Sequence, residues 1–403
     1  MNIYALSSGR GPSGIAIVRI SGKDILKVCK NLTKLKEINS NEVNYCQFYD
    51  PKNNSVIDPE ALLLWFPGPN SYTGEDLAEF QVHGSNAVIN ALLKALSEQE
   101  NCRLAEPGEF TKIAFQNGKI NLLKAESIAD LISSETEIQR QQAIKVMSGK
   151  HSEVYNSWRE ILLKILSNVE AKIDFPDENL PEYILKNIKK KSEKVKNEIN
   201  KALDDQKVGE RIREGFKIAI VGPSNAGKSS LLNYLSRREV AIVSEIAGTT
   251  RDVIETHLNI DGLPVVLSDT AGIRKSKDEI EKKGIRLALE KAENADLNIV
   301  IIEPKNAHLT GFFKDLLSEK SILVINKSDL GIDNIVYEFK KFNPIYISLK
   351  KEKNLDQLIN VIKKKLKNKF ITSEDILITR ERHRQHLEQC VYHLKNFEDK
   401  NKL

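Results

Sequence analysis

The segment from residue 216 to residue 229 constrains the fold of this chain more than any other stretch of its sequence. An apolar run, Phe-Lys-Ile-Ala-Ile-Val, ends at Val221 and is followed directly by Gly222-Pro-Ser-Asn-Ala-Gly-Lys-Ser229, which matches the pattern G-x-x-x-x-G-K-[ST]. An amphipathic helical pattern comes next. A strand, such a loop and a helix in this order can surround phosphate oxygens with backbone amides and a helix N-terminus. The segment therefore predicts a P-loop domain with a doubly wound sheet.

The residues of this loop have predicted roles toward a nucleotide. Lys228 is expected to neutralise the β- and γ-phosphates and to act in catalysis, and Ser229 is expected to ligate Mg²⁺. The other loop residues predicted to bind the nucleotide are Asn225, Ala226, Gly227 and Ser230. The alternative is a glycine-containing turn that binds nothing, and the motifs that follow count against it.

Three further motifs each come after an apolar run. Asp269 begins Asp-Thr-Ala-Gly, where a carboxylate can reach the metal, often through water, and the Gly272 amide can donate to the γ-phosphate. Asp329 ends Asn-Lys-Ser-Asp and offers two acceptors to guanine N1–H and the exocyclic amine, which selects GTP over ATP. Ser348, in Ser-Leu-Lys, is expected to close over the base. The predicted nucleotide contacts here are Asp269, Thr270, Ala271, Gly272, Asn326, Lys327, Asp329 and Ser348.

The string Gly248-Thr-Thr-Arg-Asp252 lies between the predicted first helix and second strand, where GTPases keep the loop that senses the γ-phosphate. Thr250 is predicted to ligate Mg²⁺ and to act in catalysis. The loop residues predicted to bind the nucleotide are Ser244, Glu245, Ile246, Ala247, Gly248, Thr249 and Thr250. Ile273 stands where a glutamine often orients the attacking water, so the polarity for hydrolysis must come from elsewhere.

The flanking sequence predicts further domains. Residues 1–118 mix β-rich runs at 15–20, 61–66 and 77–82 with turn residues and one helical stretch near 87–96, which indicates a compact α+β domain. From Ile144 apolar residues keep helical spacing as one long helix, which residues 174–177 break before a second helix.

The strands and helices that alternate between residues 216 and 368 predict a largely parallel sheet. An amphipathic segment after Thr372 needs partners, and the long helices before residue 210 are the expected ones. The predicted architecture is multidomain α+β and α/β, with the P-loop GTPase domain inserted into a helical bundle domain. Its four segments are an N-terminal domain at 1–118, a first helical segment at 119–210, the GTPase domain at 211–370 and a second helical segment at 371–403.

Composition sets limits on the class of protein. The apolar runs are too short to span a bilayer, and residues 1–14 lack the pattern of a secretory signal, so a cytoplasmic protein without a membrane segment is expected. Four cysteines without a Cys-x-x-Cys pair favour inert thiols over a disulfide framework or a zinc site. A net charge of +5 from 61 basic and 56 acidic residues permits RNA binding without arguing for it.

Several of these features together resemble the MnmE (TrmE) family of tRNA modification GTPases. They are Asn225 in the P-loop, the string that begins at Gly248, Ile273, and a helical domain split by the GTPase domain. Three N-terminal strings are also similar to the family: Gly11-Pro-Ser-Gly-Ile-Ala-Ile-Val-Arg-Ile-Ser-Gly22, Pro69-Asn-Ser-Tyr-Thr-Gly-Glu-Asp76, and Arg103-Leu-Ala-Glu-Pro-Gly-Glu-Phe-Thr-Lys112 with Asn117-Gly-Lys119. The matching strings run from residue 3 to about residue 397.

The resemblance implies a potassium-activated GTPase. In the family, the asparagine that matches Asn225 holds K⁺ with backbone oxygens that match Ser244, Ile246 and Thr249. Glu281 matches a glutamate that helps to position the hydrolytic water; without the resemblance it reads as a helix-surface carboxylate.

For the N-terminal domain the resemblance implies dimerisation and binding of 5-formyltetrahydrofolate. The residues similar to the family's contacts are Arg19, Glu79 and Lys119. Cations can meet the glutamate tail of the folate, and a carboxylate can accept from the pterin. Taken alone, each residue would read as a member of an ion pair within the domain or as a turn anchor.

The resemblance implies a homodimeric, K⁺-stimulated GTPase that forms a heterotetramer with an FAD-containing partner and modifies C5 of the wobble uridine in tRNA, in the carboxymethylaminomethyl type of reaction. Two alternatives come from other classes: a ribosome-assembly or regulatory GTPase, and a folate-dependent one-carbon transferase with an incidental GTPase domain. A third keeps the family and GTP hydrolysis but not tRNA modification, because the family's terminal Cys-x-Gly-Lys has no counterpart here. Cys390 lies in a helical stripe and is interpreted as a packing residue.

Overall fold

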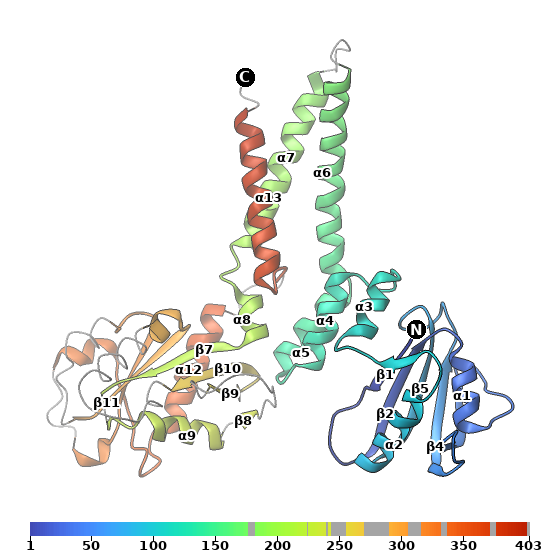
Figure 1. Ribbon diagram of the computed structural model, residues 1–403. Helices are drawn as coiled ribbons and strands as arrows, with labels where there is room; N and C mark the ends of the chain where they lie inside the picture. The colour runs from blue at the N-terminus through green and yellow to red at the C-terminus, as the bar shows by residue number, and fades with distance from the viewer. Residues whose placement is uncertain are drawn as a thin grey trace, which may run out of the picture. The chain divides into compact units, whose positions relative to one another are not determined.

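The computed structural model describes residues 1–175, 182–223, 225–238, 241–242, 255–269, 290–304, 316–331, 337–370 and 376–400. Contacts divide the chain into two compact units, Met1–Glu126 and Ser127–Leu403, both drawn in Figure 1. Within the described ranges, no helix combines the length and the apolar character that crossing a membrane requires.

The first unit is built on a six-stranded sheet in the order β3-β4-β5-β2-β1-β6, in which only the β1–β6 pair is parallel. Buried Val18 and Ile20 alternate with Arg19 on β2, so Arg19 lies on the face of the sheet opposite the main core. The strands are β1 (Asn2–Leu6), β2 (Ser13–Gly22), β3 (Val43–Tyr49), β4 (Val56–Phe66), β5 (Asp76–Gly84) and β6 (Cys102–Leu104).

The helices of this unit correct the expectation of a single helical stretch. Besides the expected α2 (Asn86–Ser97), the structure has α1 (Ile25–Thr33) and α3 (Glu109–Gln116), and α4 (Leu122–Ile132) follows. α1 buries apolar residues at helical spacing but is only nine residues long, and α3 buries one residue, Ala114. Such short segments give a weak periodic signal because they hold few turns.

The long helices of the second unit are α5 (Glu137–Met147), α6 (Lys150–Asp174), α7 (Glu182–Leu203) and α13 (Glu381–Lys400). The expected helix running on from Ile144 is wrong at its start, because Gly149 has a φ of 90° and separates α5 from α6. The predicted end near residue 174 and the second helix are confirmed.

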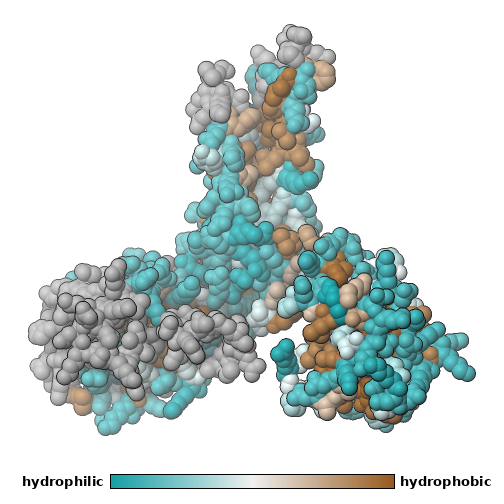
Figure 2. Space-filling model, in the orientation of Figure 1, coloured by the Kyte–Doolittle hydropathy of each residue, from teal (hydrophilic) through white to brown (hydrophobic). Residues whose placement is uncertain are grey.

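α13 packs against α6 and α7, which confirms the partners predicted for the segment after Thr372. Their shared core consists of Trp158, Val195, Ile199, Val391 and Leu394. An apolar groove of about 360 Å³ runs beside this core, and Figure 2 shows apolar surface along α6, where Leu163 and Leu166 are exposed.

The cysteines lie in or against apolar cores. Cys29 and Cys46 are buried in the first unit, and burial raises the pKa of the Cys46 thiol to about 11 and that of Cys29 further still. Cys390 packs against the core of the long helices, and burial raises its pKa as well. Thiols held in the protonated form are poor nucleophiles.

The second unit also holds a seven-stranded sheet in the order β13-β12-β11-β7-β10-β9-β8. β9 is antiparallel to β10 and to β8, and the other pairs are parallel, which confirms a largely parallel sheet. The strands are β7 (Phe216–Val221), β8 (Ala241–Ile242), β9 (Glu255–Ile260), β10 (Leu263–Asp269), β11 (Leu297–Ile302), β12 (Ser321–Ile325) and β13 (Ile345–Tyr346).

β7 lies at the centre of this sheet, and both of its faces are buried. Ile218 and Ile220 belong to one core, whereas Ala219 and Val221 belong to the core on the other face. A strand buried on both sides needs the near-continuous apolar run seen in the sequence. The parallel strands end at one edge, and α9 (Lys228–Arg238), α12 (Leu355–Phe370) and the 3₁₀ turns η2 (Ser328–Leu330) and η3 (Tyr337–Phe342) complete the domain as far as the structure describes it.

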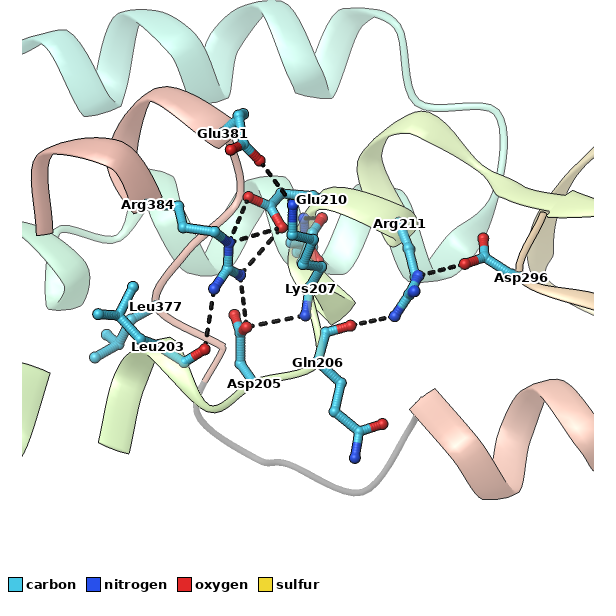
Figure 3. A network of polar contacts seen from close by, with 12 residues as sticks. Leu203, Asp205, Gln206, Lys207, Glu210, Arg211, Asp296, Leu377, Glu381 and Arg384 are labelled. Atoms are coloured by element: carbon cyan, nitrogen blue, oxygen red, sulfur yellow. Dashed lines mark hydrogen bonds and ion pairs between the residues drawn. The ribbon is translucent and has the colours of Figure 1, made fainter. Parts of the chain in front are cut away.

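A short helix, α8 (Val208–Glu214), joins the long helices to the start of this sheet (Figure 1), and Figure 3 shows its polar contacts. Its Glu210 accepts hydrogen bonds from Arg384 of α13, and its Arg211 pairs with Asp296 at 2.6 Å. The Asp296 carboxylate also accepts the backbone N–H of Lys217 at the beginning of β7. The end of the sheet away from the P-loop is therefore tied to α13 through α8.

Candidate functional site

The loop between β7 and α9 has the close backbone approaches of a phosphate-binding turn. A Cβ on Gly222 would lie 2.1 Å from the Ile301 carbonyl oxygen, and one on Gly227 would lie 2.3 Å from Asn326 Nδ2. Gly227 also has a φ of 105°, and Asn225 a φ of 65°. The close approaches leave no room for a side chain at Gly222 or Gly227. Asparagine is one of the few residues with a side chain that readily adopt the left-handed conformation of Asn225.

Lys228 and Ser229 begin α9, so they lie at a helix N-terminus where anions are favoured. The Lys228 ammonium donates to the carbonyl oxygens of Gly222 and Pro223, both at 2.9 Å. The cation is thus folded onto the loop that would hold the phosphates. The first turn of α9 and the loop together form a positively polarised concavity.

Asn326 connects three of the predicted motifs. It follows β12, is 3% exposed, and its side-chain amide donates to the Ala226 carbonyl oxygen of the P-loop at 2.9 Å. Its Oδ1 accepts the backbone N–H of Leu349, next to Ser348, at 3.2 Å. A single buried side chain therefore fixes the P-loop against both base-side motifs.

Asp329 is prepared as a hydrogen-bond acceptor. The Ser348 hydroxyl donates to its Oδ1 at 2.6 Å. This bond, with smaller effects from Lys351 and Lys350, holds the pKa of the Asp329 carboxyl below its usual range. An ionised carboxylate only accepts, which is the chemistry that the paired N–H groups of guanine require.

A cavity of about 1000 Å³ lies over these motifs. Asn225, Gly227 and Ser230 line it from the P-loop and α9, whereas Lys327 and Asp329 line it from the turn after β12. Further lining residues are Asn233, Tyr234, Arg237, Arg238, Asn326, Leu330, Leu349, Lys350 and Glu352. Its size is at the upper end of the range for cofactor sites, and its residues converge from three strand ends.

Other predicted residues lie outside the described ranges of the chain. They are Ser244, Glu245, Ile246, Ala247, Gly248, Thr249, Thr250, Thr270, Ala271, Gly272, Ile273 and Glu281. For Asp269 the structure describes the backbone, which ends β10 opposite Ile220 of β7. The predicted position of Asp269 at the end of a strand is confirmed, and the structure adds that this strand is parallel to β7.

The N-terminal unit brings Arg19 and Glu79 together. They are cross-strand partners on β2 and β5, and the guanidinium donates twice to Glu79 Oε1, at 2.6 and 3.0 Å. The Arg19 guanidinium carbon lies 5.5 Å from the ring centre of Tyr72 and 5.8 Å from that of Phe110. Lys119 donates at 2.7 Å to the Pro69 carbonyl oxygen, at the start of the loop that carries Tyr72.

Sequence reasoning missed four residues of these sites. Tyr72 and Phe110 stand inside strings that resembled the family, but no pattern marks an aromatic residue as the neighbour of an arginine. Leu349 contributes a backbone N–H, which any residue type except proline carries. Glu303 pairs with Lys327, and its position directly after the apolar run of β11 was the available signal.

Comparisons with known proteins match this chain along its whole length. A family model described as the MnmE helical domain matches residues 122–402, and one described as the GTP-binding protein TrmE N-terminus matches residues 2–119. A relative from Pelagibacter ubique, named tRNA modification GTPase MnmE, is 67% identical over 401 residues and covers 100% of this chain and 90% of the relative. One of the same name from Rickettsia bellii is 44% identical over 409 residues and covers 100% of this chain and 91% of the relative.

Among solved structures, the Era protein of Aquifex aeolicus is 30% identical and matches 40% of this chain and 57% of its own, with a TM-score of 0.30.

Proposed function

The chain belongs to the MnmE family of tRNA modification GTPases and hydrolyses GTP, and from this premise we propose that it is a K⁺-stimulated enzyme for C5 modification of the wobble uridine in tRNA. The modification is of the carboxymethylaminomethyl type and takes place in the cytoplasm with an FAD-containing partner. The single observation that carries the GTP site of this proposal is the joining of the P-loop to both base-side motifs by Asn326, and the tRNA reaction is inferred from the relatives named tRNA modification GTPase MnmE.

The proposed GTP site uses the described residues as follows. Backbone amides of the P-loop and of the α9 N-terminus bind the phosphates, and Lys228 moves from the loop carbonyls to the phosphate oxygens. Asp329, ionised and held by Ser348, accepts from the guanine edge. Adenine places a different donor pattern at this edge, so the site rejects ATP.

Hydrolysis is proposed to need oxygen ligands for two cations. Ser229 and Asn225 supply side-chain oxygens on the phosphate side, which suits hard cations. Ser229 and Thr250 would hold Mg²⁺, and Asn225 with Ser244, Ile246 and Thr249 would hold K⁺. Bound cations offset the charge that develops on the phosphates. Glu281 is proposed to orient the attacking water.

The N-terminal unit is proposed to bind 5-formyltetrahydrofolate and to form a homodimer. The Arg19–Glu79 pair is partly exposed, with side-chain exposures of 28% and 18%, so both charges can exchange partners with a ligand. The aromatic rings beside Arg19 suit a flat pterin, and Lys119 supplies a second cation. The folate supplies a one-carbon unit, and two chains with two FAD-containing partners form the proposed heterotetramer.

We propose that the chain is organised in the same four segments: 1–118, 119–210, 211–370 and 371–403. The contact of α13 with α7 supports a helical domain made of two separate stretches. GTP hydrolysis in the inserted domain would drive a conformational change used in tRNA modification.

The test is GTP turnover with KCl replaced by NaCl at equal ionic strength. K⁺ should accelerate hydrolysis by at least about tenfold, since a cation placed on developing charge lowers the barrier. Asn225→Ala should remove the acceleration, whereas the control Asn200→Ala, on the exposed side of α7, should keep it. Equal rates in the two salts would contradict K⁺ stimulation and favour a regulatory or ribosome-assembly GTPase.

A further inference from the structure

Glu303 directly follows β11 and contacts the base-side motif without belonging to it. Its Oε2 lies 2.5 Å from Lys327 Nζ, and its side chain is 16% exposed against 36% for the lysine. We propose that Glu303 is a positioning residue for guanine recognition, which acts by holding Lys327. This inference rests on the proposed GTP site.

The topology brings the two side chains together. β11 and β12 are parallel neighbours with Ile302 opposite Ile325, and the Asn326 backbone N–H donates to the Ile302 carbonyl oxygen at 2.8 Å. The residue after β11 therefore lies beside the turn that follows β12. A carboxylate at this place can reach the lysine from the next strand end.

Lys327 adopts a strained backbone conformation within its motif. Its φ of 58° is left-handed, a conformation that costs a residue with a Cβ. Asn326 is fixed by the P-loop and Leu349, and Asp329 is fixed by Ser348. The side chain of Lys327 is held in the same way, by its ion pair with Glu303.

The pair also decides which carboxylate the lysine neutralises. Asp329 is two residues from Lys327, and both line the same cavity. A lysine ammonium bound to Asp329 would occupy the oxygens that guanine needs. With its ammonium on Glu303, Lys327 can lay its apolar stem along the base while Asp329 keeps its acceptors for the ligand. Glu303 thereby determines both the shape and the charge of the part of the cavity that is proposed to bind the base.

The experiment uses Glu303→Gln, which keeps the side-chain size and removes the charge. The Kd for N-methylanthraniloyl-GDP should rise about tenfold, the size expected for losing one charged hydrogen bond. The KM for GTP should rise with it, whereas kcat at saturating GTP should change by less than about twofold. Preference for GTP over ITP should fall, because ITP lacks the amine that Asp329 reads.

Two variants serve as controls. Glu319→Gln removes the same charge from an exposed turn before β12 and should change neither constant. Glu303→Asp keeps the charge on a shorter stem and should recover some of the GTP preference.

The outcomes distinguish the GTP site from the role of Glu303. A wild-type chain that does not bind the GDP probe overturns the proposed GTP site itself. A wild-type chain that binds it, with an unchanged Kd and GTP/ITP ratio in Glu303→Gln, overturns the role of Glu303. A raised Kd with an unchanged ratio and a lowered melting temperature also overturns it, since that is what a purely structural ion pair gives.

Discussion

Arg384 in the second unit and Arg19 in the first both pair with carboxylates, yet their surroundings differ. Arg384 is 6% exposed, and all three guanidinium nitrogens donate: to Glu210, to Asp205 and to the Leu203 carbonyl oxygen. Arg19 is 28% exposed, and both of its bonds end on one oxygen of Glu79. Figure 3 shows how closely the acceptors surround Arg384.

The difference separates a structural clamp from a site that can accept a ligand. The acceptors around Arg384 are Leu203 at the end of α7, Asp205 just after it, and Glu210 of α8. Their exchange for a ligand would break the junction of α8 and α13. Arg19 has aromatic neighbours and access to solvent beside its bonds to Glu79. Burial and the number of acceptors, rather than residue type, therefore indicate which arginine can act on a ligand.

The largest predicted effect is on the free energy of unfolding and comes from replacing Arg384. Arg384→Met keeps most of the side-chain volume but leaves Glu210 and Asp205 as buried carboxylates that have lost their shared cation. The free energy of unfolding should fall by about 3–5 kcal/mol, the usual result of removing one partner of a buried ion pair. Urea unfolding measures this change.

Arg159→Met, which breaks the exposed Arg159–Glu160 pair of α6, is the control for this measurement and should have little effect. A loss below about 1 kcal/mol for Arg384→Met would place that arginine with ordinary surface pairs and remove the contrast with Arg19.

A smaller effect is expected at the other end of α8. Arg211→Met removes the cation from Asp296, whose carboxylate still accepts the Lys217 backbone N–H. One remaining hydrogen bond reduces the penalty, so the free energy of unfolding should fall by about 2 kcal/mol. Arg140→Met breaks the exposed Arg140–Glu137 pair of α5 and is the control, which should leave the free energy of unfolding almost unchanged. Equal losses of stability in both variants would show that burial does not determine how much each ion pair stabilises the fold.

The sequence predicted those features of the fold that depend on short-range pattern. The central strand β7 could be predicted from its six residues, because a strand buried on both faces needs an apolar run. The P-loop could be predicted from its motif, because a phosphate-binding turn needs glycine where the backbone approaches other atoms closely. The start of α6 was missed because periodicity continues across Gly149, whereas the backbone there turns left-handed.

Contacts between distant segments could not be predicted from one sequence. Arg384 meets Asp205 across 179 positions of the chain, and Glu303 meets Lys327 only because β11 and β12 are neighbours in the sheet. Charged residues are common at helix ends and strand ends, so residue type alone does not mark the few that pair. Family resemblance named Arg19 and Glu79, but their shared register on β2 and β5 came from the structure.

Substitution of Arg19 is predicted to have the smallest effect on stability but a large effect on ligand binding. Arg19→Gln should change the free energy of unfolding by less than about 1 kcal/mol, because the pair is partly exposed and Glu79 can be hydrated. If Arg19 meets the folate, the same variant should weaken 5-formyltetrahydrofolate binding by at least about tenfold in calorimetric titration, since a charged hydrogen bond to the ligand is lost. Lys30→Gln, an exposed change of equal charge on α1, should leave both quantities unaltered. A stability loss as large as that of Arg384→Met, with binding preserved, would make Arg19 a second clamp and assign the ligand to other residues.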